Sequence, residues 1–186
     1  MRETVSAMLR HHPFVLEFDA RHIERLATLA KDVRFDRNHV IFREGDECSE
    51  FYLVVKGLVA LEIAAPGHTF RVQTLFAGDE LGWSAVLMGS GKHFQARALE
   101  PVTALAFEGE QLLASFKADP QFGLAFMLRL MGVVSERLAR ARSEVARTGR
   151  ADLLARVELT HCAAQVASLA FGPCAGFETL RADAGP

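Results

Sequence analysis

The sequence predicts a mainly β domain with flanking helices, its strands forming an antiparallel barrel or sandwich. Short runs of β-branched, aromatic and other apolar residues recur between residues 33 and 107 and are separated by turn residues. Helical periodicity appears before and after this region. Hydrophobic residues make up 50% of the chain, which is enough to build a buried core.

The N-terminal segment, residues 1–32, is expected to be helical. In DARHIERLATLAKD, residues 19–32, the apolar residues Ile23, Leu26 and Ala30 recur at helical spacing. Asp19 precedes them as a candidate N-cap.

Residues 33–118 are expected to form the β domain and a short closing helix that starts near Glu110. The strands are predicted at VRF, HVIF, FYLVV, LVALEIA, FRVQTLF, HFQARAL and VTALAF. Residues 78–93 lie between the fifth and sixth of these runs and begin with the turn GDELG; they contain the only Trp of the chain. A glycine turn that leads into a short helix is suited to hold an anion.

A long helix is expected from Asp119 and Pro120, as N-cap and first helical residue, to about Arg147 within the segment 119–149. Its apolar stripe either packs on the chain's own β domain or forms a seam between two chains. We favour the seam, because the stripe is longer than a small barrel can cover. The predicted dimer interface comprises Phe122, Phe126, Leu130, Val133, Val134, Leu138 and Ala141.

Composition and missing motifs exclude several functions. A net charge of −2 argues against a protein that coats nucleic acid. The three cysteines, without a CxxC pair, indicate either free thiols in a reducing cytoplasm or ordinary small core residues, and no metal site is expected. No run is long enough for a membrane span, and no hydrolase or P-loop motif is present, so we expect neither membrane insertion nor catalysis. Residues 150–186 are expected to hold a short helix and a frayed tail without a helix-turn-helix.

Several spaced motifs between Val33 and Arg147 resemble the cyclic-nucleotide-binding domain of Crp/Fnr regulators and of cyclic-nucleotide-dependent kinases and channels. They are IFREGDECSEFYLVVKGLVALE (41–62), with Gly45 and Gly57 at the family's turn glycines, GDELG (78–82), ARA (96–98) and the phenylalanines of the long helix. The resemblance implies a β-roll, or jelly roll, with an N-terminal helix and a long C-terminal helix.

The resemblance also locates a phosphate cassette at residues 78–93. In nucleotide-binding members a Gly-Glu pair opens the short helix and its Glu binds the ribose 2′-hydroxyl, while an Arg followed by Ser or Thr clamps the cyclic phosphate. Here Gly82 aligns with the glycine, Trp83 replaces the Glu, and Lys92 followed by His93 replaces the Arg pair. Losing two charge-assisted bonds is expected to cost ~3–6 kcal/mol, or roughly 10²- to 10⁴-fold in affinity.

Each cassette residue has two interpretations. Trp83 is either a core or lid residue or a stacking platform for a flat ligand. Lys92 is a solvated loop lysine or a point charge for a phosphate. His93 is structural or a pocket donor, and Ser84 is a candidate N-cap of the inserted helix. The candidate ligand-binding residues are Gly78, Leu81, Gly82, Trp83, Ser84, Lys92, His93 and Phe94.

The motifs GWS (82–84) and HFQARALEPV (93–102) are themselves similar to a group of small stand-alone bacterial proteins without the nucleotide clamp. The expected function is a non-catalytic cytoplasmic signalling protein, a homodimer that senses a small ligand and relays it through its C-terminal helix. The protein would sense a cyclic nucleotide bound without the usual clamp, another small anion, or a partner protein. The alternatives are a Crp/Fnr-type transcriptional regulator with a lost or diverged DNA reader, and a ligand-free protein–protein adaptor. Sequence-specific DNA binding is not expected, since no recognition helix follows the long helix.

Overall fold

The computed structural model describes residues 4–47, 49–65, 68–87, 92 and 94–148. Three short helical elements open the chain within the segment predicted to be helical, and only the last of them corresponds to a helix located by its apolar spacing; that helix ends at Leu29, because the first strand begins at Lys31. Asp19 occupies the N-cap position of that helix, as predicted, although its side chain makes no capping hydrogen bond. The elements are α1 (Val5–Arg10), the 3-10 helix η1 (Pro13–Val15) and α2 (Ala20–Leu29).

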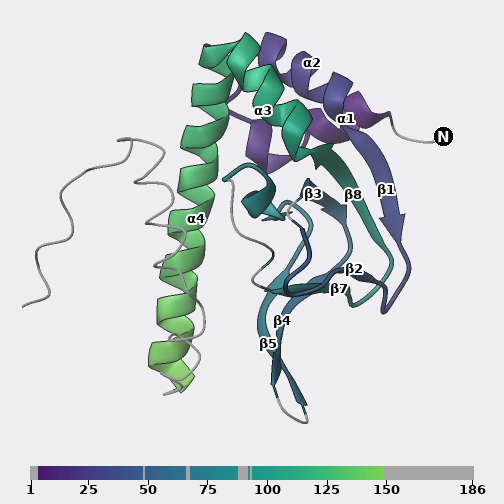
Figure 1. Ribbon diagram of the computed structural model, residues 1–186, viewed down its shortest axis with the longest axis vertical. Coiled ribbons are helices and arrows are strands. Elements are labelled where there is room, and N and C mark those ends of the chain that lie inside the picture. The colour runs from purple at the N-terminus through teal and green to yellow at the C-terminus, as the bar shows by residue number, and fades with distance from the viewer. Residues whose placement is uncertain (1–3, 48, 66–67, 88–91, 93, 149–186) are drawn as a thin grey trace, which may run out of the picture.

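The β domain consists of two four-stranded sheets in which all described strand pairs are antiparallel (Figure 1). The strand order is β1-β8-β3-β6 in one sheet and β2-β7-β4-β5 in the other. This confirms the mainly β fold class, and the predicted strands correspond to seven of the eight. The strands are β1 (Lys31–Phe35), β2 (Val40–Phe42), β3 (Glu50–Lys56), β4 (Val59–Ala65), β5 (His68–Leu75), β6 (Glu80–Leu81), β7 (Gln95–Ala98) and β8 (Val102–Glu108).

Two apolar clusters hold these layers together. The first lies between the two sheets and takes alternate residues from facing strands, among them Val54, Val59 and Ala98. The second lies between the β1-β8-β3-β6 sheet and the helices and is rich in aromatic rings. Its fully buried phenylalanines are Phe14, Phe51, Phe107, Phe122 and Phe126.

The C-terminal helices are α3 (Gly109–Ala118) and α4 (Pro120–Thr148). Asp119 caps α4, because its Oδ1 accepts a hydrogen bond from the Phe122 N–H at 3.2 Å. With 29 residues, α4 is about 43 Å long and runs along the β domain from the end where α2 and α3 lie (Figure 1). None of the helices that the structure describes combines the length and apolar character needed to cross a membrane.

The apolar stripe of α4 faces the chain's own core. Four of the predicted dimer-interface residues, Phe122, Phe126, Leu130 and Val133, are between 0% and 4% exposed and pack against the second cluster. The interpretation that they face a second chain therefore does not hold for these four in this structure. Val134 is half-buried, and the side chains of Leu138 and Ala141 lie outside the described residues.

The exposed apolar residues of α4 lie on the opposite face of the helix. They are Leu124, Leu128 and Met131, which are 61%, 61% and 46% exposed. The predicted division into segments 1–32, 33–118, 119–149 and 150–186 stays a prediction, and residues 149–186 lie outside the described part of the chain.

Candidate functional site: the cassette and its contact with α4

The cassette begins with a tight turn held against β3. The Gly78 N–H donates to the Val54 carbonyl at 2.8 Å, and the Val54 N–H donates to the Asp79 carbonyl at 2.9 Å. The Asp79 carboxylate closes the turn by accepting from the Phe76 N–H at 2.8 Å. Leu81 of β6 then pairs with Tyr52 of β3, and its side chain belongs to the apolar cluster between the sheets. These hydrogen bonds hold the turn against β3.

Gly82 permits the chain to leave β6 and enter η2 (Trp83–Ala85). Its φ is +76°, and a Cβ at this position would lie 2.3 Å from the Glu50 carbonyl oxygen. Gly82, and not Ser84, occupies the N-cap position of η2. The prediction that Ser84 is the N-cap is wrong, because the left-handed Gly82 starts the helix two residues earlier; Ser84 is instead buried within it.

Lys92 lies at the base of the cassette and is 5% exposed. Its Nζ donates to the Glu50 carbonyl oxygen at 3.1 Å and lies 4.8 Å from the centroid of the Phe42 ring. Its backbone is hydrogen-bonded to the Gly45–Asp46 turn, with the Lys92 N–H donating to the Asp46 carbonyl at 2.9 Å. The interpretation of Lys92 as a solvated loop lysine is therefore wrong: its ammonium group ties the end of the cassette to β3.

The carboxylate of Glu50 on β3 makes a second polar contact. The Tyr52 hydroxyl donates to Glu50 Oε2 at 2.5 Å. Burial, followed by this hydrogen bond, raises the pKa of Tyr52 well above its ordinary value. The Tyr52 hydroxyl therefore stays protonated at neutral pH and acts as a donor.

Trp83 meets the long helix. The guanidinium carbon of Arg137 lies 4.8 Å from the centroid of the Trp83 ring, so η2 and α4 touch directly; the segment after β6 lies beside α4 in Figure 1. Arg137 Nη2 donates to the Glu80 carbonyl oxygen and lies 3.7 Å from Glu80 Oε2. Burial raises the pKa of Glu80, while the charges of Arg137 and Arg129 act in the opposite direction. This is a buried ion pair between the cassette turn and α4.

A more exposed ion pair lies next to the buried one. Arg140 Nη1 is 3.8 Å from Asp79 Oδ1, and its Nη2 is 3.6 Å from Glu136 Oε2 in the same helix. The Arg140 side chain is 59% exposed, so this pair is well screened by water.

The predicted ligand-binding residues fall into three groups. Gly78 and Gly82 shape the turn, and Leu81, Ser84 and the half-buried Phe94 belong to the packed interior. Trp83 lies against Arg137 of α4, and Lys92 donates to the Glu50 carbonyl of β3. His93 lies outside the described residues.

Sequence reasoning missed Glu80 and Arg137 as members of this site. Glu80 lies within the predicted GDELG turn, and Arg137 lies within the predicted long helix, and neither was named as a site residue. One signal was available: Arg137 continues the spacing of Phe126, Leu130 and Val133, so it lies on the buried face of α4.

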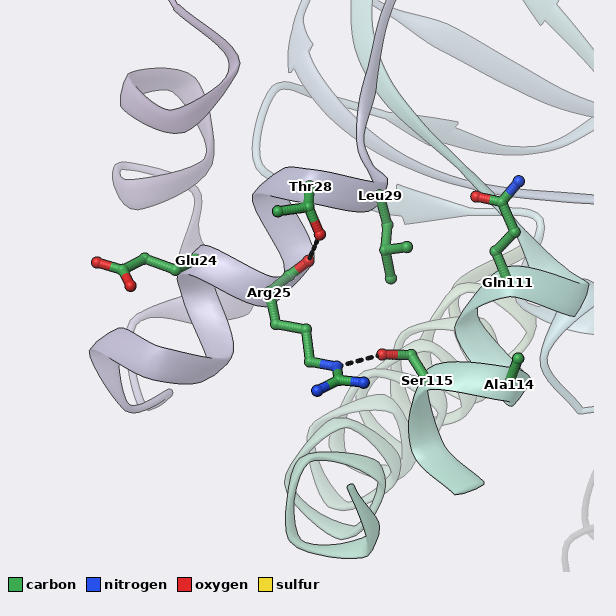
Figure 2. Close-up of a pocket in the computed structure, with 7 residues that line it drawn as sticks. All are labelled: Glu24, Arg25, Thr28, Leu29, Gln111, Ala114 and Ser115. Carbon is green, nitrogen blue, oxygen red and sulfur yellow. Dashed lines mark hydrogen bonds between the residues drawn. The ribbon is translucent and has the colours of Figure 1, made fainter. Parts of the chain in front are cut away.

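A separate groove lies between α2 and α3 (Figure 2). It has a volume of about 620 Å³ and is crossed by a hydrogen bond from Arg25 Nε to Ser115 Oγ at 2.6 Å. It is lined by Glu24, Arg25, Thr28, Leu29, Gln111, Ala114 and Ser115, none of which is part of the cassette.

A two-sheet β domain with an inserted short helix, closed by a long C-terminal helix, is the arrangement that the sequence motifs predicted. Residues 32–119 match the family model described as cyclic nucleotide-binding domain. This match confirms the resemblance of the motifs to that family.

Two relatives show in which proteins such segments occur. Over 123 residues, 66% of this chain, it is 29% identical to an uncharacterized NTE family protein of Mycobacterium tuberculosis, of which the match covers 20%. Over 104 residues, 54% of this chain, it is 32% identical to the global nitrogen regulator of Nostoc sp., of which the match covers 45%. The chain therefore spans less than half the length of either relative.

Solved structures show the same fold. A cyclic nucleotide-binding domain from Methylobacillus flagellatus aligns with a TM-score of 0.66 and 17% identity, over 70% of this chain and 74% of that one. The N-terminal domain of a transcriptional regulator from Streptomyces coelicolor aligns with a TM-score of 0.59 and 22% identity, over 73% and 95%. At these identities the likeness establishes the fold alone.

Proposed function

We propose that this chain is a non-catalytic, cytoplasmic regulatory protein whose cassette, residues 78–93, binds a small ligand and whose helix α4 transmits the state of the cassette. The observation that carries this proposal is the direct contact of Trp83 and Glu80 with Arg137 of α4. A ligand that moves the cassette must disturb this contact, and a change in α4 must reach the cassette through it. The family match supports the proposal that the cassette binds a ligand. The three cysteines, none of them in a CxxC motif, support a cytoplasmic location.

The ligand is proposed to be a cyclic nucleotide bound without the usual clamp, or another small anion. Lys92 stands at the position of the family's phosphate-binding Arg, but its Nζ donates to a backbone carbonyl of β3 and is buried. An ammonium group also lacks the planar fork with which Arg grips a phosphate. Trp83 offers an indole ring where the family has a ribose-binding carboxylate.

Calorimetric titration of the full chain with cAMP, cGMP and cyclic dinucleotides tests this proposal. We expect cAMP to bind no more tightly than the millimolar range, because two charge-assisted contacts are replaced. Lys92→Ala should lower stability more than it changes cAMP affinity, with the exposed Lys56→Ala as the matched control. Micromolar cAMP binding that Lys92→Ala abolishes and Lys56→Ala preserves would contradict the altered clamp.

The relay is proposed to act at the start of α4. Asp119 joins α3 to α4, and its carboxylate lies 3.8 Å from Arg21 Nη2 and 4.0 Å from His22 Nε2, both on α2. The His22 ring also lies 5.4 Å from the Phe122 ring. The N-terminal end of α4 is thus held by α2 while its middle is held by the cassette, so loosening the second contact lets the helix pivot about the first.

We further propose that a second copy of the chain packs on the exposed face of α4. Leu124, Leu128 and Met131 are spaced by four and three residues, as in a two-stranded coiled coil, and are largely exposed. The sequence continues this spacing at Ser135 and Leu138. A stable dimer needs roughly 800 Å² from each partner, so the seam must extend beyond the first three residues along α4.

Light scattering coupled to gel filtration tests the dimer. The wild type should run as a dimer, and Leu128→Glu should give a folded monomer with unchanged circular dichroism, because a carboxylate would be buried in the seam. Leu16→Glu is the control: Leu16 is 68% exposed and does not belong to α4, so this variant should remain dimeric. A monomeric wild type, or a dimer that survives Leu128→Glu, would refute this seam.

A DNA-binding regulator is the second candidate function. It is favoured by the similarity to the Nostoc global nitrogen regulator and to the Streptomyces regulator domain. Gel retardation of genomic promoter fragments at physiological salt separates it from the main proposal, since sequence-specific retardation requires a reading element.

A ligand-free adaptor is the third candidate. It is favoured by the position of Arg137, whose guanidinium lies against the ring of Trp83 and so covers the surface on which a flat ligand would stack. Under this alternative none of the nucleotides in the titration changes the melting temperature of the protein.

A further inference from the structure

Three groups of the cassette converge on the guanidinium of Arg137. The Trp83 ring lies against it at 4.8 Å from centroid to guanidinium carbon. Glu80 Oε2 lies 3.7 Å from Nη2, and the same nitrogen donates to the Glu80 carbonyl oxygen. The side chains of Arg137 and Glu80 are 8% and 5% exposed, so water solvates neither of them well.

This combination of groups selects a guanidinium by its chemistry. The face of an indole ring attracts a flat cation, and a carboxylate together with a carbonyl accepts N–H donors that lie in one plane. An anion in the same position would face the carboxylate of Glu80 and the negative face of Trp83. The part of the cassette formed by these two residues therefore has the opposite preference to a phosphate site.

Fold stability alone does not account for a buried pair at this place. Two charges are removed from water, and an apolar pair of similar size is often at least as stable. The pair instead joins segments that are 57 residues apart in the sequence. It allows α4 to dock only in the position where the Arg137 guanidinium contacts Glu80 and Trp83. Neighbouring Arg140 makes a different contact, a pair with Asp79 in which its own side chain is 59% exposed.

We propose that Trp83 and Glu80 form a guanidinium-binding site, that Arg137 is its intramolecular occupant, and that the site accepts a free guanidinium compound when Arg137 is removed. Docking of α4 on the cassette is then arginine recognition within one chain. The inference does not rest on the ligand proposed above, because it concerns a contact made within the chain itself.

The test is chemical rescue of Arg137→Ala in the full chain. Trp83 is the only tryptophan, so its fluorescence reports directly on the proposed site. We expect Arg137→Ala to shift the emission to longer wavelength and to speed amide exchange of residues 134–148 by about ten- to a hundredfold, as loss of a cation–π contact and a charged hydrogen bond implies. Methylguanidinium in the millimolar range should reverse both changes, and methylammonium, with the same charge but no planar fork, should not.

Two matched variants complete the design. Arg140→Ala removes an exposed arginine three residues further along α4 and should leave the Trp83 emission unchanged. Arg137→Lys retains the charge and should still speed exchange of α4, since an ammonium cannot make the in-plane contacts. Wild-type exchange and emission in a folded Arg137→Lys protein would overturn the proposal. Rescue of Arg137→Ala by methylammonium as effective as that by methylguanidinium would do the same.

The experiment remains decisive if Arg137→Ala does not fold in buffer. Refolding in methylguanidinium but not in methylammonium is then the expected result. If neither compound restores folding, Arg137→Lys decides: faster exchange of α4 with shifted emission supports the site, and wild-type behaviour overturns it.

Discussion

Mild acid is expected to destabilise the fold through His12, which is 3% exposed and lies between α1 and η1. Its Nδ1 accepts a hydrogen bond from the Phe14 N–H at 3.2 Å, and its Nε2 lies 3.2 Å from the Val54 carbonyl oxygen, to which it donates. Only the neutral ring can make both bonds, because protonation of Nδ1 removes the acceptor. Protonation must therefore break the hydrogen bond by which His12 caps η1.

The magnitude follows from the pKa of His12. Burial lowers this pKa from 6.5 to about 4, against the raising effect of the bond to Val54. Because the folded pKa lies below the unfolded one, the stabilising contribution is complete above pH 6.5 and is lost as the pH falls towards 4. The loss is about 2 kcal/mol between pH 7 and pH 5, and about 3 kcal/mol below pH 4.

Urea denaturation at pH 7 and pH 5 measures this contribution when the wild type is compared with His12→Gln. Glutamine keeps an amide donor for the Val54 carbonyl and does not titrate. The wild type should lose about 2 kcal/mol more of its free energy of unfolding than the variant over this interval. Equal losses in the two proteins would refute the assignment.

The buried carboxylate of Glu62 does not obscure this window. Burial opposes ionisation of Glu62, but hydrogen bonds from Arg97 and Gln95 outweigh it and lower its pKa below 4.5. Its folded pKa is therefore below its unfolded one, and its contribution is lost mainly below pH 4.5.

Two substitutions test the packing that positions the cassette and α4. Gly82→Ala should cost at least about 2 kcal/mol in thermal unfolding, because the new Cβ meets the Glu50 carbonyl at 2.3 Å in addition to the strain of a positive φ. Gly45→Ala shares the positive φ but has nothing within 4 Å of the added Cβ, so a cost as large as that of Gly82→Ala would contradict the clash. Phe126→Ala should lower the free energy of unfolding, measured by urea denaturation, by about 3–5 kcal/mol. Leu124→Ala, on the exposed face of α4, should change it by no more than about 0.5 kcal/mol. Similar values for the two variants would show that α4 does not pack as described.

Local patterns predicted most of the elements correctly. Alternating apolar runs predicted seven strands, because residues along a strand face the core and the outside in turn. The Asp119-Pro120 pair predicted the start of α4, and the capping bond to the Phe122 N–H confirms it. β6 was missed because a strand of two residues has no periodicity to detect, and α1 and η1 are too short to show a helical stripe.

The α4 stripe shows where periodicity stops being informative. The spacing of Phe122, Phe126 and Leu130 indicates one apolar face, but spacing does not say whether the chain itself or a second chain covers it. The structure assigns this face to the core around Phe14 and Phe51. The candidate seam therefore moves to the opposite face of the helix.

The sequence by itself determined the class of fold and the position of the GDELG turn, because periodicity, turn glycines and capping residues act over a few neighbouring positions. It also predicts that the usual clamp is altered, since Trp83 and Lys92 take the clamp positions in the ungapped alignment of GDELG and ARA. Only the tertiary structure decided the partners of these side chains: Lys92 is held by the Glu50 carbonyl, 42 residues away, and Arg137 meets Glu80 across 57 residues. Contacts over such separations depend on how the sheets and α4 pack, and no local pattern records that packing.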